Sequence, residues 1–188
     1  MNNQNLEWDV KNEQKLLKTA VFTVNETTSI SPDGNEGHFV IMDAPDWVIV
    51  IPEINGNFLM VKQWRHGNNS LSIEFPGGVI NSGEKPEVAA AREMEEETGY
   101  KAGKLIYLGC ANPNPALMKN RVHFFVAEDL QGSGEQNLDE DEYVDYMQIP
   151  ASEVYTKIGS KDYPHALMMA ALLKYTIYKK GCPFGQPR

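Results

Sequence analysis

The chain has 188 residues, long enough to bury one substantial hydrophobic core and too short to promise two, so we expect one compact domain with at most a small appended unit. A formal charge of −9 disfavours nucleic acid as the main partner, because proteins that bind its phosphate backbone usually carry a basic surface. No apolar run approaches the roughly 20 residues needed to span a bilayer, and the polar segment Met1–Trp8 does not resemble a signal peptide. We therefore expect a cytoplasmic protein that does not contact a membrane.

The N-terminal third is rich in residues that favour β-strands. Residues 18–24 and 37–43 flank a turn-forming segment, and they are predicted to pair as a hairpin. Residues 47–52 and 58–64 flank Asn55-Gly56, a dipeptide suited to the positive φ angles of a type I′ turn. These two runs predict a second hairpin.

Two helices are predicted. The first begins near Pro86, where the missing N–H costs nothing, and ends at Gly99, which can adopt the left-handed cap conformation. Lys85 at its N-cap lacks the short oxygen-bearing side chain that caps best. The second helix covers about residues 164–180. Its apolar face, which core packing explains, comprises Met168, Ala171, Leu172, Tyr175 and Tyr178.

The region between the helices is predicted to hold strands and loops. Residues 105–108 and 122–127 are expected to be strands, and Asn112–Pro115 lies between them in a rigid loop. Residues 131–142 are rich in Gly, Ser and acidic side chains, which predicts a mobile surface loop.

The first helix carries a cluster of carboxylates. Glu93, Glu96 and Glu97 stand at i, i+3 and i+4, so they project from one face, where like charges repel. A solvated acidic face is the ordinary interpretation of such a cluster. A site for Mg²⁺ is the alternative, because this ion binds a few carboxylates and keeps waters for substrate phosphates. Arg92 can pair with Glu96 one turn further on.

This helix and the loop before it resemble the Nudix box, G-x5-E-x7-R-E-U-x-E-E-x-G-U, where U is apolar. Met94 and Tyr100 fill the U positions. The seven fixed identities are all present: Gly78, Glu84, Arg92, Glu93, Glu96, Glu97 and Gly99.

The resemblance implies the α/β fold class, as a Nudix α/β/α sandwich with a mixed sheet. In that fold the box forms a loop, helix and loop that bind metal and pyrophosphate. By position, Glu93 and Glu97 look like the principal metal ligands, Glu96 assists them, and the backbone carbonyl of Gly77 also binds. The implied metal is Mg²⁺, with Mn²⁺ as the alternative.

The segments around the box are similar to the ADP-ribose and nucleoside diphosphate sugar pyrophosphatase branch of this family. They comprise residues 47–51, 61–66 and 73–78. In addition, Pro115 lies where that branch typically carries proline, although a proline in a turn needs no function.

Arg65 and Glu74 resemble residues that line the nucleotide and sugar pocket of that branch. Arg65 has a second interpretation, as a surface salt-bridge partner. His66 and His123 are expected to be structural or solvent-facing, because lone histidines in strands rarely indicate a metal site.

The resemblance also implies an oligomer. Residues 1–45 are similar to a β-rich subdomain through which related enzymes form swapped homodimers, and residues 46–188 would form the Nudix hydrolase domain. The implied reaction is metal-dependent hydrolysis of the pyrophosphate linkage, which gives a nucleoside monophosphate and a sugar phosphate.

The general base is expected on the acidic loop. In relatives of this branch it is often a Glu outside the box, which makes Glu140 and Glu142 the candidates and Glu93 the alternative. A loop whose acidic residues only maintain solubility would have the same composition.

Two other functions remain open. The first is a Nudix hydrolase for nucleoside triphosphates or capped RNA, which would use the same box. The second is a non-catalytic domain that senses a nucleotide, although intact Glu93, Glu96 and Glu97 and the lack of a DNA-binding extension disfavour it. The sequence does not choose between ADP-ribose, ADP-glucose and GDP-mannose.

Overall fold

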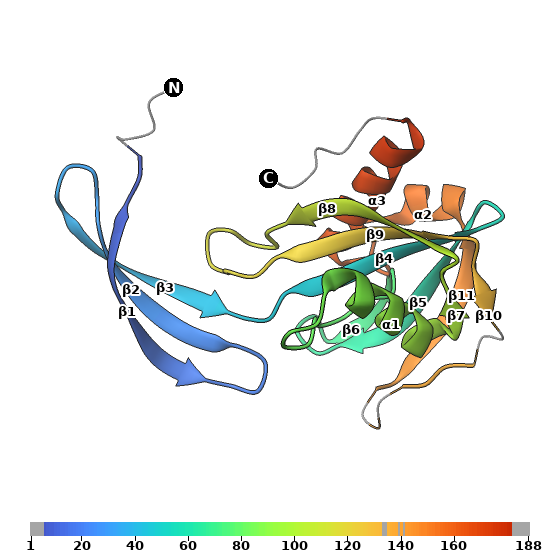
Figure 1. Cartoon of the computed structure of the whole chain (residues 1–188), viewed down its shortest axis with the longest axis horizontal. Coiled ribbons are helices and arrows are strands. Elements are labelled where there is room, and N and C mark those ends of the chain that lie inside the picture. The colour runs from blue at the N-terminus through green and yellow to red at the C-terminus, as the bar shows by residue number, and fades with distance from the viewer. Residues whose placement is uncertain (1–5, 133–134, 139, 141, 182–188) are drawn as a thin grey trace. The chain divides into compact units, whose positions relative to one another are not determined.

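The computed structural model describes residues 6–132, 135–138, 140 and 142–181 (Figure 1). It divides into two compact units. The smaller comprises Met1–Pro45 with Asn112–Arg121, and the larger comprises Asp46–Ala111 with Val122–Arg188. None of the helices in the described ranges is long and apolar enough to cross a membrane.

The smaller unit is a three-stranded antiparallel sheet in the order β1 (Asp9–Lys18), β2 (Thr23–Ile30) and β3 (Glu36–Asp43). Strands β2 and β3 pair as a hairpin, which confirms the second predicted strand, residues 37–43. The predicted first strand, residues 18–24, is wrong in its bounds, because residues 19–22 form the turn between β1 and β2, closed by the Thr19 N–H donating to the Phe22 carbonyl at 3.0 Å. The sequence did not predict strand β1, because this strand is mostly polar and is exposed along its whole length.

The larger unit contains a six-stranded mixed sheet in the order β11-β5-β4-β9-β8, with β6 paired to β5. Strands β4 and β9 are parallel, and the other neighbours are antiparallel. A separate short ladder joins β7 (Tyr100–Lys101) to β10 (Gln131–Gly132). The strands of the large sheet are β4 (Trp47–Ile54), β5 (Asn57–Arg65), β6 (Ser70–Glu74), β8 (Lys104–Ala111), β9 (Val122–Glu128) and β11 (Val144–Pro150).

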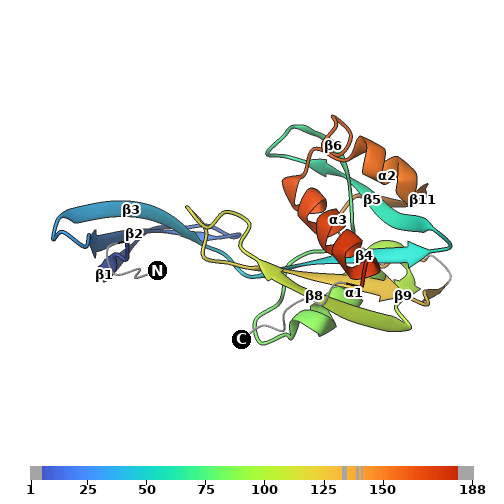
Figure 2. The same cartoon turned by 90° about the horizontal axis from the view of Figure 1, so that it is seen from above.

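Helices cover both faces of this sheet (Figures 1 and 2). Alternate residues of β4 point to opposite faces. Val48 and Val50 pack with α1 (Pro86–Thr98), whereas Ile49 and Ile51 pack with α2 (Ala151–Lys157) and α3 (Ala166–Lys179). The predicted α/β/α sandwich with a mixed sheet is confirmed.

Local sequence signals fixed several boundaries correctly. The β4–β5 turn has positive φ angles at Asn55 and Gly56, 50° and 78°. Helix α1 ends on Gly99 with φ 72°, and Lys85 at its N-cap makes no side-chain capping bond, as predicted. Four of the five residues predicted on the apolar face of the last helix are buried: Met168, Ala171, Leu172 and Tyr175.

Candidate active site

The loop between β6 and α1 forms the floor of the site. The carbonyls of Pro76 and Gly78 accept hydrogen bonds of 2.9 Å from backbone N–H groups of β4. Gly77 between them has φ 155°, and a Cβ there would lie 2.1 Å from the Val48 carbonyl oxygen, so only glycine fits. Its N–H donates to Glu97 Oε2 at 2.9 Å. Among the hydrogen bonds of the described residues, none involves the Gly77 carbonyl.

Helix α1 brings its carboxylates against this loop. Fully buried Met94 and Ala90 pack against the sheet, which fixes the rotation of the helix. The Glu93 carboxylate then lies so close to Gly78 that a Cβ at Gly78 would be 2.5 Å from its Oε2. Gly78 thus leaves room for the carboxylate.

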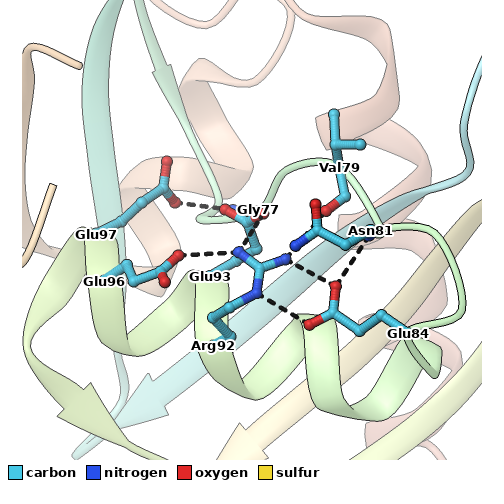
Figure 3. Close-up of polar contacts among 8 residues, drawn as sticks. All are labelled: Gly77, Val79, Asn81, Glu84, Arg92, Glu93, Glu96 and Glu97. Atoms are coloured by element: carbon cyan, nitrogen blue, oxygen red, sulfur yellow. Dashed lines mark hydrogen bonds and ion pairs between the residues drawn. The ribbon is translucent and has the colours of Figure 1, made fainter. Parts of the chain in front are cut away.

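Arg92 holds the acidic side chains in place (Figure 3). Its guanidinium donates through Nε and Nη2 to the two oxygens of Glu84, at 2.9 Å each. Nη1 donates to Glu93 at 3.0 Å and to Glu96 at 2.9 Å, which confirms the predicted pairing with Glu96. Nη2 also donates to the Val79 carbonyl at 3.1 Å. These bonds use every N–H of the side chain.

Burial makes the Glu97 carboxylate hard to ionise. Glu97 is only 4% exposed. Desolvation raises the pKa of Glu97 to about 8; the Gly77 hydrogen bond opposes that rise, and the charges of Glu93 and Glu142 add to it. Burial also raises the pKa of Glu93, against the effect of Arg92. When ionised, a buried carboxylate such as that of Glu97 beside the partly buried Glu93 is costly unless a cation accompanies it.

These residues fit a divalent metal. Within the described ranges, no three acidic, histidine or cysteine side chains already surround a common point. The reason is that Arg92 draws Glu93 and Glu96 toward itself, while Glu97 binds the Gly77 N–H. Carboxylate and backbone carbonyl oxygens are nevertheless the donors that hard cations prefer. The unengaged Gly77 carbonyl and the clustered carboxylates provide that donor set.

A cavity of about 260 Å³ adjoins the carboxylates. It shares Gly77 and Gly78 with the loop between β6 and α1, and Arg65, Glu74 and His165 contribute polar side chains. Sites that enclose a whole small-molecule ligand usually measure roughly 300–1,000 Å³. This cavity is therefore sized for one part of a nucleotide-like ligand.

Arg65 and Glu74 form a two-pronged ion pair in this cavity. Arg65 donates through Nε at 2.8 Å and through Nη2 at 2.7 Å to the Glu74 carboxylate. The Glu74 side chain is 1% exposed and that of Arg65 is 41% exposed. Burial would raise the pKa of Glu74, but Arg65 outweighs it and holds that pKa below its ordinary value. Arg65 thus both forms a salt bridge and lines the cavity.

Comparison with known proteins identifies the family. The NUDIX domain model matches residues 42–171. The chain belongs to the Nudix family. It is 35% identical to an ADP-ribose pyrophosphatase of Bacillus subtilis (strain 168) over 133 residues, which cover 70% of this chain and 72% of that protein. It is 31% identical to a methanol dehydrogenase activator of Bacillus methanolicus over 157 residues, which cover 79% of this chain and 85% of the relative.

The Nudix fold is also found in a solved structure titled "Crystal structure of ADP compounds hydrolase". The match has a TM-score of 0.83 and 23% identity, and it covers 93% of this chain and 95% of that one. At this identity the match establishes the fold. The family and branch that the sequence resembles are confirmed by the domain match and the named relatives.

The acidic loop after β10 is attached to the C-terminal end of the Nudix helix. The Gln136 side chain donates to the Glu97 carbonyl at 2.5 Å and to the Val144 carbonyl at 2.9 Å. The Asn137 N–H donates to the Glu96 carbonyl at 2.9 Å. No sequence signal marked these two anchors, because they depend on how the loop folds back on the helix.

Glu140 and Glu142, the predicted bases, are both exposed. The charge of Glu142 adds to the raised pKa values of Glu93 and Glu97, although desolvation is the larger cause for both, and Glu140 is not among the main causes. Of the two predicted bases, Glu142 is therefore the one whose charge acts on the carboxylates of the Nudix box.

The remaining predicted residues lie outside this cluster. Pro115 is exposed in the Asn112–Arg121 loop of the smaller unit, and its contact with substrate stays a prediction. His66 is exposed, and His123 is held between Tyr107 Oη at 3.1 Å and Asp46 at 3.3 Å, as expected for histidines outside the Nudix site. No sequence signal marked His165, because its position in the cavity depends on how α3 packs.

Proposed function

We propose that this Nudix pyrophosphohydrolase cleaves the pyrophosphate linkage of a nucleoside diphosphate sugar, with ADP-ribose as the first candidate and Mg²⁺ as the metal. The products would be a nucleoside monophosphate and a sugar phosphate. The observation that carries the proposal is the cavity of Arg65 and Glu74, which shares Gly77 and Gly78 with the carboxylate cluster. A pyrophosphate at the carboxylates leaves its attached sugar next to this cavity. The printed function of the Bacillus subtilis relative supports the same substrate class.

The metal ligands we propose are Glu93, Glu97, Glu96 and the Gly77 carbonyl. When bound there, divalent ions neutralise charge on the pyrophosphate and lower the barrier to attack by water. Arg92 acts through these residues, because its hydrogen bonds fix the positions of Glu93 and Glu96. The positive charge of Arg65 opposes part of the rise in the pKa of Glu97.

We propose Glu142 as the general base that takes the proton of the attacking water, ahead of Glu140 and Glu93. Its charge adds to the raised pKa values of both Glu93 and Glu97, and that of Glu140 is not among the main causes, which favours Glu142 over Glu140. Glu93 is already engaged by Arg92, so it is less available as a base. The hydrogen bonds of Gln136 and Asn137 would hold the loop in this place.

We propose that the enzyme is a homodimer built on the β-rich unit of residues 1–45. All ten residues of β1 are exposed, including Val10, Leu16 and Leu17. A three-stranded sheet needs a covered hydrophobic face for stability, and a long exposed edge strand favours pairing with another chain. A second copy of this chain would cover the exposed apolar side chains and pair with the edge strand β1.

Product identification tests the proposed reaction. The purified protein is incubated with ADP-ribose, ADP-glucose, GDP-mannose, ATP or a capped RNA oligonucleotide, with Mg²⁺ or with a chelator. We expect AMP and ribose 5-phosphate from ADP-ribose in Mg²⁺ and no product with the chelator. Glu97→Gln serves as the inactive control. Cleavage confined to ATP or capped RNA would contradict the substrate class, and binding without cleavage would indicate a sensor.

A further inference from the structure

His165 presents an unused hydrogen-bond donor to the cavity. It is the N-cap residue of α3, and its Nδ1 accepts a hydrogen bond from the Leu167 N–H at 3.2 Å. A nitrogen that accepts cannot carry the proton, so in the neutral ring the proton is on Nε2. The capping bond therefore fixes the tautomer and points an N–H donor away from the helix.

The His165 ring is uncharged at neutral pH. Burial lowers the pKa of His165, and Arg65 lowers it further, while the nearby Glu74 charge opposes both effects. The imidazole therefore offers one donor at Nε2 and no positive charge.

Nε2 has a carboxylate near it but not bonded to it. Glu74 Oε2 lies 4.0 Å away, beyond hydrogen-bond distance. Among the residues that the structure describes, no other acceptor forms a hydrogen bond with Nε2. The side chain is 32% exposed and lines the cavity, so a ligand can reach this donor.

A donor and an acceptor at this separation match a single hydroxyl group. A hydroxyl oxygen about 2.8 Å from each atom accepts from Nε2–H and donates to the carboxylate. Glu74 can accept this bond because a carboxylate has more lone-pair sites than Arg65 occupies. A phosphate oxygen is a poor fit, because it cannot donate and Glu74 would repel it.

We propose that His165 and Glu74 together bind one hydroxyl of the sugar adjoining the scissile pyrophosphate, so that His165 is a substrate-binding residue. This proposal rests on the proposed function, because the cavity adjoins the carboxylate cluster through Gly77 and Gly78. The ligand class assigned to this site is a hydroxyl-bearing ring. An analogue that lacks the bound hydroxyl should therefore bind more weakly.

Two variants separate the donor from the helix cap. In His165→Asn the shorter side chain can still cap α3 but does not reach the position of Nε2, because Asn is a favourable N-cap. In His165→Gln the longer amide can place an N–H near that position and loses the preferred cap. Thermal unfolding of both variants controls for effects on the fold.

The experiment compares ADP-ribose with its monodeoxy analogues, each lacking one ribose hydroxyl. The dissociation constant is measured by calorimetry without metal, so that no turnover occurs, and kcat/KM is measured in Mg²⁺. Wild type should bind one analogue roughly three- to tenfold more weakly than ADP-ribose. His165→Asn should bind ADP-ribose more weakly than wild type by the same factor, and should bind that analogue as wild type does. His165→Gln should recover part of the lost affinity for ADP-ribose.

Equal affinity of wild type for ADP-ribose and every analogue would overturn the proposal, whether or not the variants fold. Undiminished discrimination by folded His165→Asn would also overturn it, as would a failure to bind ADP-ribose. The proposed function is judged separately by wild-type turnover. If wild type discriminates a hydroxyl through His165 but does not cleave ADP-ribose, the proposed function fails and the binding site stands.

Discussion

At the residue scale, Arg92 is the side chain that organises the acidic cluster. It bonds to Glu84, Glu93 and Glu96 from one planar group, so each carboxylate is fixed relative to the others. Lysine has the same charge but a single ammonium with three donors and no fork geometry. Charge alone therefore cannot replace Arg92.

We expect Arg92→Lys to lower kcat by about tenfold to a hundredfold, because residues that orient metal ligands typically contribute that much. The measurement is steady-state turnover with saturating Mg²⁺. Lys101→Arg, at the exposed residue of β7, is a matched control that should leave kcat unchanged. Wild-type turnover by a folded Arg92→Lys protein would show that the hydrogen-bond fork does not position the ligands.

Glu97 gives the metal-free protein a distinct pH dependence. The unfolded chain loses this proton near the ordinary pKa of 4.5, and the folded protein near 8. Between these values the folded state binds more protons than the unfolded state, so the free energy of unfolding falls as the pH rises. We expect the Tm of metal-free wild type to fall between about pH 5 and pH 8.

The Glu97→Gln variant should lose this contribution, because its side chain cannot ionise. Thermal unfolding in a chelator at several pH values measures the effect. Glu95→Gln, at an exposed position of the same helix, should keep the wild-type slope. Identical slopes for Glu97→Gln and wild type would contradict the assignment of a protonated, buried Glu97.

At the element scale, the sequence predicted those elements whose ends carry local signals. Helix α1 was correct at both ends because Pro86 and Gly99 act through their own backbone chemistry. Strand β6 was missed because it buries Ser72 and Glu74 and exposes Leu71, the reverse of a hydrophobic alternation. Its inward Glu74 becomes acceptable only when Arg65 of the neighbouring strand pairs with it, which is tertiary information.

The residues of the candidate site also comprise some that local sequence predicts and some that it does not. The box residues were predictable because their spacing on one helix is local. The relation of Glu142 to Glu93 and the place of His165 in the cavity were not, since each joins segments far apart in the chain.

The loop between β10 and β11 carries the proposed base. We expect Glu142→Gln to lower kcat by about 10²- to 10⁴-fold with little change in KM, because general base catalysis contributes that range. Glu140→Gln, two residues away on the same loop, is the matched control and should keep most of its activity. Steady-state kinetics with Mg²⁺ titrated to saturation separates loss of the base from loss of metal. If Glu140→Gln alone loses kcat, the base is Glu140, and if neither does, Glu93 becomes the candidate.

At the scale of the whole molecule, the smaller unit has little hydrophobic core among the residues that the structure describes. Its central strand β2 buries polar residues, including Asn25, Thr27 and Ser29, while apolar side chains of β1 and β3 remain exposed. The sequence showed that this unit is β-rich, but not that Asn112–Arg121 joins it, because that grouping links distant segments.

We expect wild type to sediment as a dimer at micromolar concentration and Leu17→Lys, on β1, to shift toward monomer with reduced activity. Leu17 is 57% exposed in the single chain, so a lysine there would be solvated in the monomer. Its charge would be buried only if a dimer covers this position. Leu173→Lys, at a position 61% exposed on α3, is the control and should remain dimeric. Sedimentation of wild type as a monomer would contradict the proposed assembly.

The substrate preference of the intact enzyme tests the central claim most directly. ADP-ribose and ATP are mixed at equal concentrations with Mg²⁺ and limiting enzyme, and the loss of each is followed by chromatography. The relative rates give the ratio of the two kcat/KM values in one measurement. The account predicts that ADP-ribose is consumed first and yields AMP and ribose 5-phosphate. Faster consumption of ATP would contradict it, and would leave a Nudix hydrolase of a different substrate class.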